Sequence, residues 1–383
     1  MLRIGVIGIG NTGNQIAALA MEELKIPVIA INSSEHDLEQ VPNGVTKLLI
    51  SDKDGLTHGA GKNRKLAKKF LKDSISGLVN KDEVSNLMEN VDVAFVVSST
   101  GGGTGSGTAL VMTDILQSIY SDVKVIIVGV TPSNNEALSS HVNSLEYLNE
   151  LYNVLDKPTY MLYDNDRVEG RSYEVINKVN EEIVKDFNVL RLYYNLPTKF
   201  DSIDERDGTR LISFAGRIVV VRLEDFKEKD CDTRSIESMI IDTLNRNCHA
   251  ECQRDKKVMA TGLIANMSQQ LFDVFDDNLP EVRKFVGDPV HGFRHIHVNE
   301  DRKDINNLFF IMSGLSAVND KIQKINETID QINENQRKLE EEQAALDGEN
   351  LKVLSEKISS DDKKDTTEDK GANISSIFRK FDV

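Results

Sequence analysis

Two glycine-rich segments, each placed directly after an apolar run, contain the residues of this sequence best suited to chemistry. The first is GIGNTG, residues 8–13, and the second is GGGTGSG, residues 101–107. Glycine lets a backbone approach a phosphate closely, and the start of a following helix offers unpaired N–H groups and a partial positive charge. Thr104, Ser106 and Thr108 add hydroxyl donors. Two such segments at one edge of one sheet predict a site for a polyphosphate.

Two common nucleotide sites fit the sequence poorly. Neither segment continues into the Gly-Lys-Ser/Thr of a P-loop. Residues 8–13 do match the GxGxxG of dinucleotide-binding enzymes, but a nicotinamide enzyme would place an acidic residue after the second strand to hold a ribose. Asn32 and Ser33 stand there instead. An oxidoreductase that uses residues 8–13 alone is therefore the alternative from another class.

The elements that must position these segments are strand-like runs that alternate with helical ones. The runs are rich in Val and Ile and apolar almost throughout, as in strands buried on both faces. Such alternation predicts an α/β fold with a doubly wound parallel sheet. The predicted strands are residues 2–8, 27–32, 91–97, 123–130 and 159–165.

The rest of the chain divides by pattern. After a first domain, residues 1–170, apolar residues at helical spacing predict a central helix at 171–195. A smaller α/β domain follows at 196–317, and a narrow apolar seam predicts a long helix at 318–358. Residues 359–383 are polar and end in NISSIFRKFDV, which suggests a docking peptide on a disordered tether. Within the smaller domain we expect strands at 216–223, 257–267 and 307–315 and a helix at 235–247.

Composition narrows the function further. The chain has 383 residues and a net charge of −16, which argues against direct binding to nucleic acid. No apolar run is long enough to span a membrane. Three cysteines form no disulfide framework, and CHAEC, residues 248–252, lacks the four ligands of a zinc site. We therefore expect reduced thiols, no protein-bound metal cluster and a cytoplasmic location.

The motifs together resemble those of the tubulin/FtsZ superfamily. GGGTGSG is similar to its signature, and GNQIAA (13–18), HGAGKN (58–63) and LYDNDR (162–167) resemble three further loops in the same order. The resemblance covers roughly residues 1–317 and is greatest to the TubZ group of plasmid and phage tubulins. It implies a self-assembling cytoskeletal GTPase that binds GTP or GDP, with Mg²⁺ offsetting the phosphate charge.

The resemblance also implies which residues contact the nucleotide. The first glycine segment would surround the α- and β-phosphates, the second would hold the β- and γ-phosphates, and the HGAGKN loop would sense the γ-phosphate. Two asparagine amides would pair with the guanine edge, since an amide both donates and accepts hydrogen bonds. The implied contacts are Gly10, Asn11, Gly13, Asn14, Gln15, Asn32, Ser33, Gly59, Ala60, Gly61, Gly101, Gly102, Gly103, Thr104, Gly105, Ser106, Gly107, Glu136, Asn165 and Asn180.

The nucleotide loops contain no obvious general base. In the family, acids from the next subunit supply that role, and the matching segment here reads FDSIDERDGTR, residues 200–210. Asp204 and Asp207 are the implied catalytic pair, and Asp201 competes with Asp204 as its first member. The site would then be completed only by head-to-tail contact between copies, which propagates into a filament.

The resemblance implies a cellular role as well. TubZ proteins move plasmid or phage DNA through a DNA-bound adaptor, and the C-terminal peptide would bind such a partner here. The alternative is an FtsZ-type cell-division GTPase, because SSIFRKF, residues 375–381, also resembles the membrane-adaptor peptide of FtsZ.

Overall fold

The computed structural model describes residues 2–55, 57, 59–192, 197–198, 202–227, 231, 235–250, 258–299 and 306–346. Within these residues ten strands form one sheet in the order β3-β2-β1-β4-β5-β6-β7-β10-β8-β9. The first six in this order pair in parallel, which confirms the predicted α/β class with a parallel sheet. These strands are β1 (Ile4–Ile9), β2 (Val28–Asn32), β3 (Thr46–Leu49), β4 (Val93–Ser99), β5 (Lys124–Thr131) and β6 (Thr159–Asp164).

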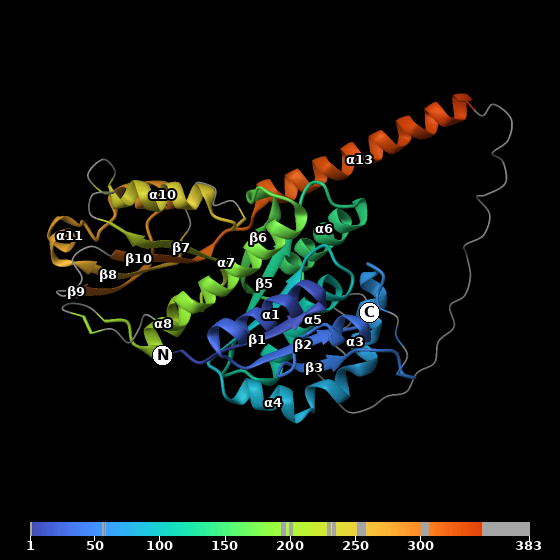
Figure 1. Ribbon diagram of the computed structural model, residues 1–383, viewed down its shortest axis with the longest axis horizontal. Coiled ribbons are helices and arrows are strands. Elements are labelled where there is room, and N and C mark those ends of the chain that lie inside the picture. The colour runs from blue at the N-terminus through green and yellow to red at the C-terminus, as the bar shows by residue number, and fades with distance from the viewer. Residues whose placement is uncertain are drawn as a thin grey trace.

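Helices cover both faces of this parallel part (Figure 1). One face packs on α1 (Gly10–Leu24) and α7 (Ser172–Leu192), and Phe95 of β4 stacks on Phe187 of α7 with ring centroids 4.2 Å apart. The other face packs chiefly on α3 (Arg64–Val79), α4 (Asp82–Glu89), α5 (Thr104–Ile119) and α6 (Leu138–Asn153). Short α2 (Glu35–Glu39) follows β2. Burial on both faces is the reason that the strands are apolar throughout.

The last four strands extend the same sheet with mixed pairing. They are β7 (Gly216–Phe226), β8 (Ala260–Ser268), β9 (His291–Asn299) and β10 (Asn306–Leu315), and β10 runs antiparallel to both β7 and β8. β7 meets β6 at only two residue pairs, Thr159–Gly216 and Tyr160–Arg217. Helices α10 (Ile236–Arg246), α11 (Gln269–Val274) and α12 (Pro280–Val286) pack around their own core.

The predicted long C-terminal helix is α13, Asn319–Leu346, which extends away from the body of the molecule (Figure 1). Its start packs against α6, where Ile325 is 1% exposed, whereas Leu339 further along is 57% exposed. Residues 347–358 of the predicted helix, and the tail and docking peptide at 359–383, lie outside the described residues. Among the described helices, none combines the length and the apolar character needed to cross a membrane.

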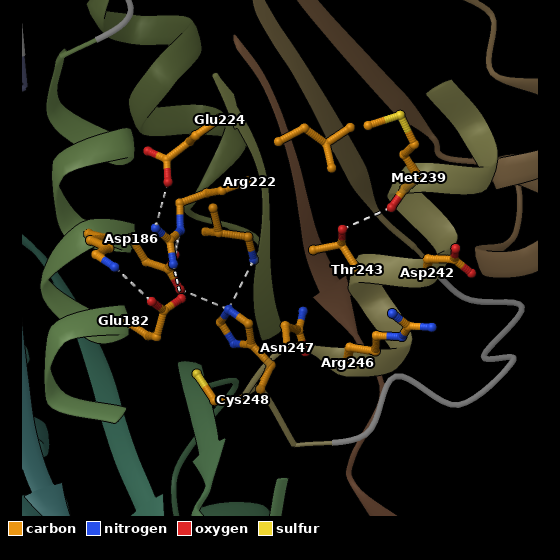
Figure 2. A pocket seen from close by; sticks show the side chains of 14 residues that line it. Glu182, Asp186, Arg222, Glu224, Met239, Asp242, Thr243, Arg246, Asn247 and Cys248 are labelled. Atoms are coloured by element: carbon orange, nitrogen blue, oxygen red, sulfur yellow. Dashed lines mark hydrogen bonds and ion pairs between the residues drawn. The ribbon is translucent and has the colours of Figure 1, made fainter. Parts of the chain in front are cut away.

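A buried ionic cluster joins α7 to β7 (Figure 2). The carboxylate of Asp186, on α7, accepts hydrogen bonds from Arg222 Nε and Tyr163 Oη, both at 2.8 Å, and lies 2.9 Å from His249 Nε2. Asp186 is 2% exposed. Burial, followed by the negative charge of Asp186, raises the pKa of Tyr163 well above its usual value, so the phenol stays a donor. A cavity of about 420 Å³ opens beside the cluster.

We expect Asp186→Ala to lower the free energy of unfolding by about 3 kcal/mol, measured by urea unfolding. The value is at the low end for a broken buried ion pair because Glu182 and Glu224 still contact Arg222. Glu334→Ala is the control, since it removes an ion pair to Lys338 that is open to solvent on α13. Equal urea midpoints for Asp186→Ala and Glu334→Ala would contradict the contribution to stability that we assign to the buried cluster.

Candidate nucleotide-binding site

The strand order reverses direction between β1 and β4, and both glycine-rich segments lie at the carboxyl ends of these strands. Ligands of open α/β sheets bind at such switch points. Helix α1 starts at Gly10 and α5 at Thr104, so both direct unpaired N–H groups to the same edge. Gly10 has a φ of 74°, and a Cβ there would lie 2.9 Å from the Gly105 nitrogen. Only glycine allows the two loops to approach this closely.

A first cavity, of about 380 Å³, lies between these two glycine-rich loops and the loop at residues 59–62, which belongs to the predicted HGAGKN motif. This loop contacts the second glycine-rich loop, because a Cβ on Gly103 would lie 2.7 Å from Lys62 Cα. Asn143 of α6 fixes this contact by donating to the carbonyls of Lys62, Gly101 and Gly102. The predicted residues that line the cavity are Gly10, Asn11, Asn32, Gly59, Ala60, Gly61, Gly102, Gly103, Thr104 and Gly105.

Lys62 is a lining residue that the sequence analysis did not select. It is the cationic side chain that borders the first cavity among the described residues, and its Nζ donates to Ser140 Oγ at 2.8 Å. An ammonium here suits a phosphate group. Asp37, which accepts from Asn32 Nδ2 at 3.2 Å, was also missed. The place of Lys62 inside HGAGKN was the available signal.

A second cavity, of about 470 Å³, adjoins the first, because Thr12 and Ser99 line both. It contains three further predicted contacts, Glu136, Asn165 and Asn180. The Glu136 carboxylate accepts from the Ser133 nitrogen at 3.1 Å and so shapes its own loop. Sequence reasoning missed Thr12 and Ser99, and it also missed the apolar wall formed by Val168, Val175 and Ile176.

The second cavity has the polar groups that a guanine base requires. The Oδ1 atom of Asn165 is buried and has no hydrogen-bond partner among the described residues. It is an acceptor, and the guanine edge offers N–H donors that would satisfy it. Asn180 is 6% exposed and reaches the same cavity from α7. Apolar Val175 and Ile176 lie beside these amides, where the face of a base could pack.

Several predicted contacts line neither cavity, and some of them pack against or hydrogen-bond to the loops that do. A Cβ on Gly13 would lie 2.2 Å from the Val97 carbonyl oxygen, so Gly13 allows α1 to pack on β4. Ser33 Oγ and Thr104 Oγ1 are 2.7 Å apart, and Ser106 Oγ donates to the Gly102 carbonyl. The residues outside both cavities are Gly13, Asn14, Gln15, Ser33, Gly101, Ser106 and Gly107.

Asn14 and Gln15 line a separate, smaller cavity beside α1, together with Asn11. Both amide atoms of Asn14 are buried without a partner among the described residues. Gln15 Nε2 donates to Asn11 Oδ1 at 3.5 Å, a long hydrogen bond between neighbouring turns of α1. Gln15 therefore reaches the nucleotide cavities through Asn11.

The two predicted acids lie at the opposite end of the molecule from the cavities. They belong to α8 (Glu205–Leu211), where Asp204 is the N-cap and accepts from the Asp207 nitrogen at 2.8 Å. Figure 1 places α8 beside the N-terminus, at the amino end of β1, whereas the cavities are at the carboxyl end. The acids of one chain thus cannot reach its own cavity. Asp201 lies outside the described residues.

No group of three His, Cys, Asp or Glu side chains in the described part of the chain is arranged to hold a metal ion.

Comparisons with known proteins agree with this geometry. Residues 3–171 match the model of the Tubulin/FtsZ family, GTPase domain. The tubulin-like protein CetZ of Pyrococcus horikoshii is 26% identical over 227 residues, which are 57% of this chain and 60% of that protein. The chain thus spans about 60% of the length of this relative and of its counterpart in Pyrococcus abyssi.

Solved structures resemble the chain over a larger part of its length. TubZ of Clostridium botulinum phage c-st has a TM-score of 0.69 and 20% identity, covering 86% of this chain and 97% of that one. A GTPγS-bound protofilament of CetZ2 from Haloferax volcanii has a TM-score of 0.70 and 19% identity, covering 87% and 100%. The match to the GTPase domain of the Tubulin/FtsZ family covers residues 3–171, less than half of the chain, and the fold over most of the chain is similar to that of these TubZ and CetZ structures.

Proposed function

We propose that this protein binds GTP across the two adjoining cavities and hydrolyses it where two copies meet head to tail. The observation that carries the proposal is the position of the two halves of the site. The phosphate loops and the unpartnered Asn165 acceptor lie at one end of the chain, and Asp204 and Asp207 lie at the other. CetZ2, a protein of similar fold, forms a GTPγS-bound protofilament.

The binding half would divide the nucleotide between the two cavities. The first turns of α1 and α5 would hold the phosphates with backbone N–H groups, and the loop at 59–62 would contact the γ-phosphate. The ammonium of Lys62 would add a positive charge near the γ-phosphate, which GTP carries and GDP lacks. The second cavity would take the base on Asn165 and Asn180. Mg²⁺ would be held largely by phosphate oxygens and water.

The catalytic half would come from the next copy. A γ-phosphoryl transfer to water requires positioning and charge stabilisation more than covalent chemistry. A carboxylate that accepts a hydrogen bond from the attacking water orients it. Asp207 suits this role better than Asp204, because Asp204 already accepts the Asp207 N–H as the helix cap. A contact between unlike ends of the molecule continues as a filament where its rotation does not close a ring.

We further propose a cytoplasmic role in moving plasmid or phage DNA through an adaptor bound to the C-terminal tail. The projecting α13 supports it, since the half of this helix that leaves the body is the half that precedes the tail in the sequence. The alternative is FtsZ-type cell division. Loss of a replicon from growing cells on deletion of this gene, with normal cell length, would support segregation, whereas filamentous cells with a stable replicon would support division.

Asn165→Ala and Asn180→Ala should each weaken GTP binding by about 10- to 100-fold, since each leaves guanine donors without an acceptor. The measurement is a titration with a fluorescent GTP analogue, with ATP as competitor to report base selectivity. Asn177→Ala is the matched comparison, because Asn177 is exposed on the same helix and does not line the cavity. A larger loss from Asn177→Ala than from Asn180→Ala would overturn the assignment of the base contact.

Asp207→Ala should leave GTP binding unchanged, slow hydrolysis by at least about 100-fold and lengthen polymer lifetime. In the unaltered protein, hydrolysis per subunit should rise above a threshold concentration, because each site needs a second copy. Phosphate release and light scattering measure both effects. Glu205→Ala on the same helix is the control and should behave normally. Hydrolysis that is independent of protein concentration would contradict a shared site.

A further inference from the structure

Lys321, in the first turn of α13, is a buried lysine that the proposed catalytic mechanism does not use. Its side chain is 3% exposed. Its Nζ donates to Asp164 Oδ1 at 2.6 Å, to Asp166 Oδ2 at 2.8 Å and to the Pro132 carbonyl oxygen at 3.4 Å. Lysine is almost never fully buried unless it is paired. A buried cation with two carboxylates is therefore a specific arrangement rather than a solvated surface contact.

The same two carboxylates organise the loop that follows β5. Asp164 Oδ1 accepts from Thr131 Oγ1 and from the Asp166 nitrogen, each at 3.1 Å. Asp166 Oδ1 accepts from the Asn134 nitrogen at 2.7 Å. Lys321 thus lies at the centre of a network that joins three segments: the loop after β5, the loop after β6 and the start of α13.

Two of these segments are walls of the second cavity. Pro132, Ser133 and Asp166 line it, and Asn165, with its unpartnered Oδ1, stands between the two aspartates. Without the ammonium, Asp164 and Asp166 would be two neighbouring carboxylates with no described cation between them. Their mutual repulsion and their desolvation would favour an open loop, and Asn165 would lose its orientation.

The position of Lys321 also depends on the docking of α13. Ile325 of α13 is buried against the core that includes α6, and the Val318 nitrogen donates to Tyr152 Oη at 3.4 Å. Further along, the helix leaves the body (Figure 1). A force or a partner that acts on the projecting half of α13 is therefore applied to the element that carries Lys321.

We propose that Lys321 is a positioning residue that couples the docking of α13 to the binding of guanine nucleotide in the second cavity. The inference rests on the proposed GTP site and adds a regulatory route to it. Binding couplings are reciprocal, so a nucleotide that orders the two loops must also strengthen the docking of α13. A partner that undocks α13 would weaken the affinity for the nucleotide by the same factor.

The first test is Lys321→Met, which keeps the length of the side chain and removes its charge. We expect the Kd for a fluorescent GTP analogue to rise at least about 10-fold, the usual scale of such couplings. Lys321→Arg should restore part of the affinity. Lys338→Met is the matched control, because Lys338 lies on the same helix with 62% of its side chain exposed. Binding by Lys321→Met that equals the unaltered protein would overturn the proposal.

A second variant separates positioning from general loss of folding. Asp166→Asn removes one of the two carboxylates that Lys321→Met leaves without their cation. The double variant should therefore bind the GTP analogue more tightly than Lys321→Met alone. Simple destabilisation would make the double variant weaker. Additive losses would therefore contradict the assignment.

The third measurement needs no substitution. Hydrogen exchange on the unaltered full chain should show slower exchange at 319–329 when GTP is added, and Lys321→Met should lose this protection. Unchanged exchange in α13 on GTP binding would sink the coupling. If the unaltered protein bound no GTP at all, the proposed function would fail together with this inference. GTP binding by the unaltered protein with no effect of Lys321→Met would remove only the inference.

Discussion

The approach of two backbones at Gly10 and Gly105 is the constraint on which the rest of the site depends. Two helices can start side by side at the switch point only if neither loop carries a side chain there. This places two sets of unpaired N–H groups around one cavity. A site built from backbone binds phosphate well, and Asp37, the acid among the described residues that lines this cavity, already accepts a hydrogen bond from Asn32 Nδ2.

The acids that we propose for catalysis lie at the other end of the molecule. Asp204 and Asp207 are carried at the far side of the sheet by the chain that follows α7. Helix α7 runs from the second cavity towards them, with Asn180 in its first half and Asp186 in its second half. The Asp186–Arg222 pair then fastens α7 to β7, where β6 and β7 share only two residue pairs. A charged contact thus reinforces the narrowest part of the sheet.

Much of this architecture could be predicted from local pattern. The strands at 4–9, 28–32, 93–99, 124–131 and 159–164 were placed to within two residues, because burial on both faces makes them apolar throughout. β9 was missed because histidines and an arginine interrupt its pattern in HGFRHIHVN. Thr12, Lys62 and Lys321 were missed for other reasons. Thr12 and Lys62 lie inside motifs that were recognised, whereas the contacts of Lys321 join segments far apart in the chain, and no local spacing records such contacts.

Two buried ion pairs are among the contacts that local spacing does not record. Two buried cations are paired with carboxylates from other elements: Arg222 of β7 with Asp186 of α7, and Lys321 of α13 with Asp164 and Asp166 at the end of β6. Apolar pairs could fill the same volumes at lower desolvation cost. Ion pairs, however, fix orientation and fail sharply when one partner moves. Such contacts suit the proposed coupling, in which the docking of α13 and the order of the loops around the second cavity depend on each other.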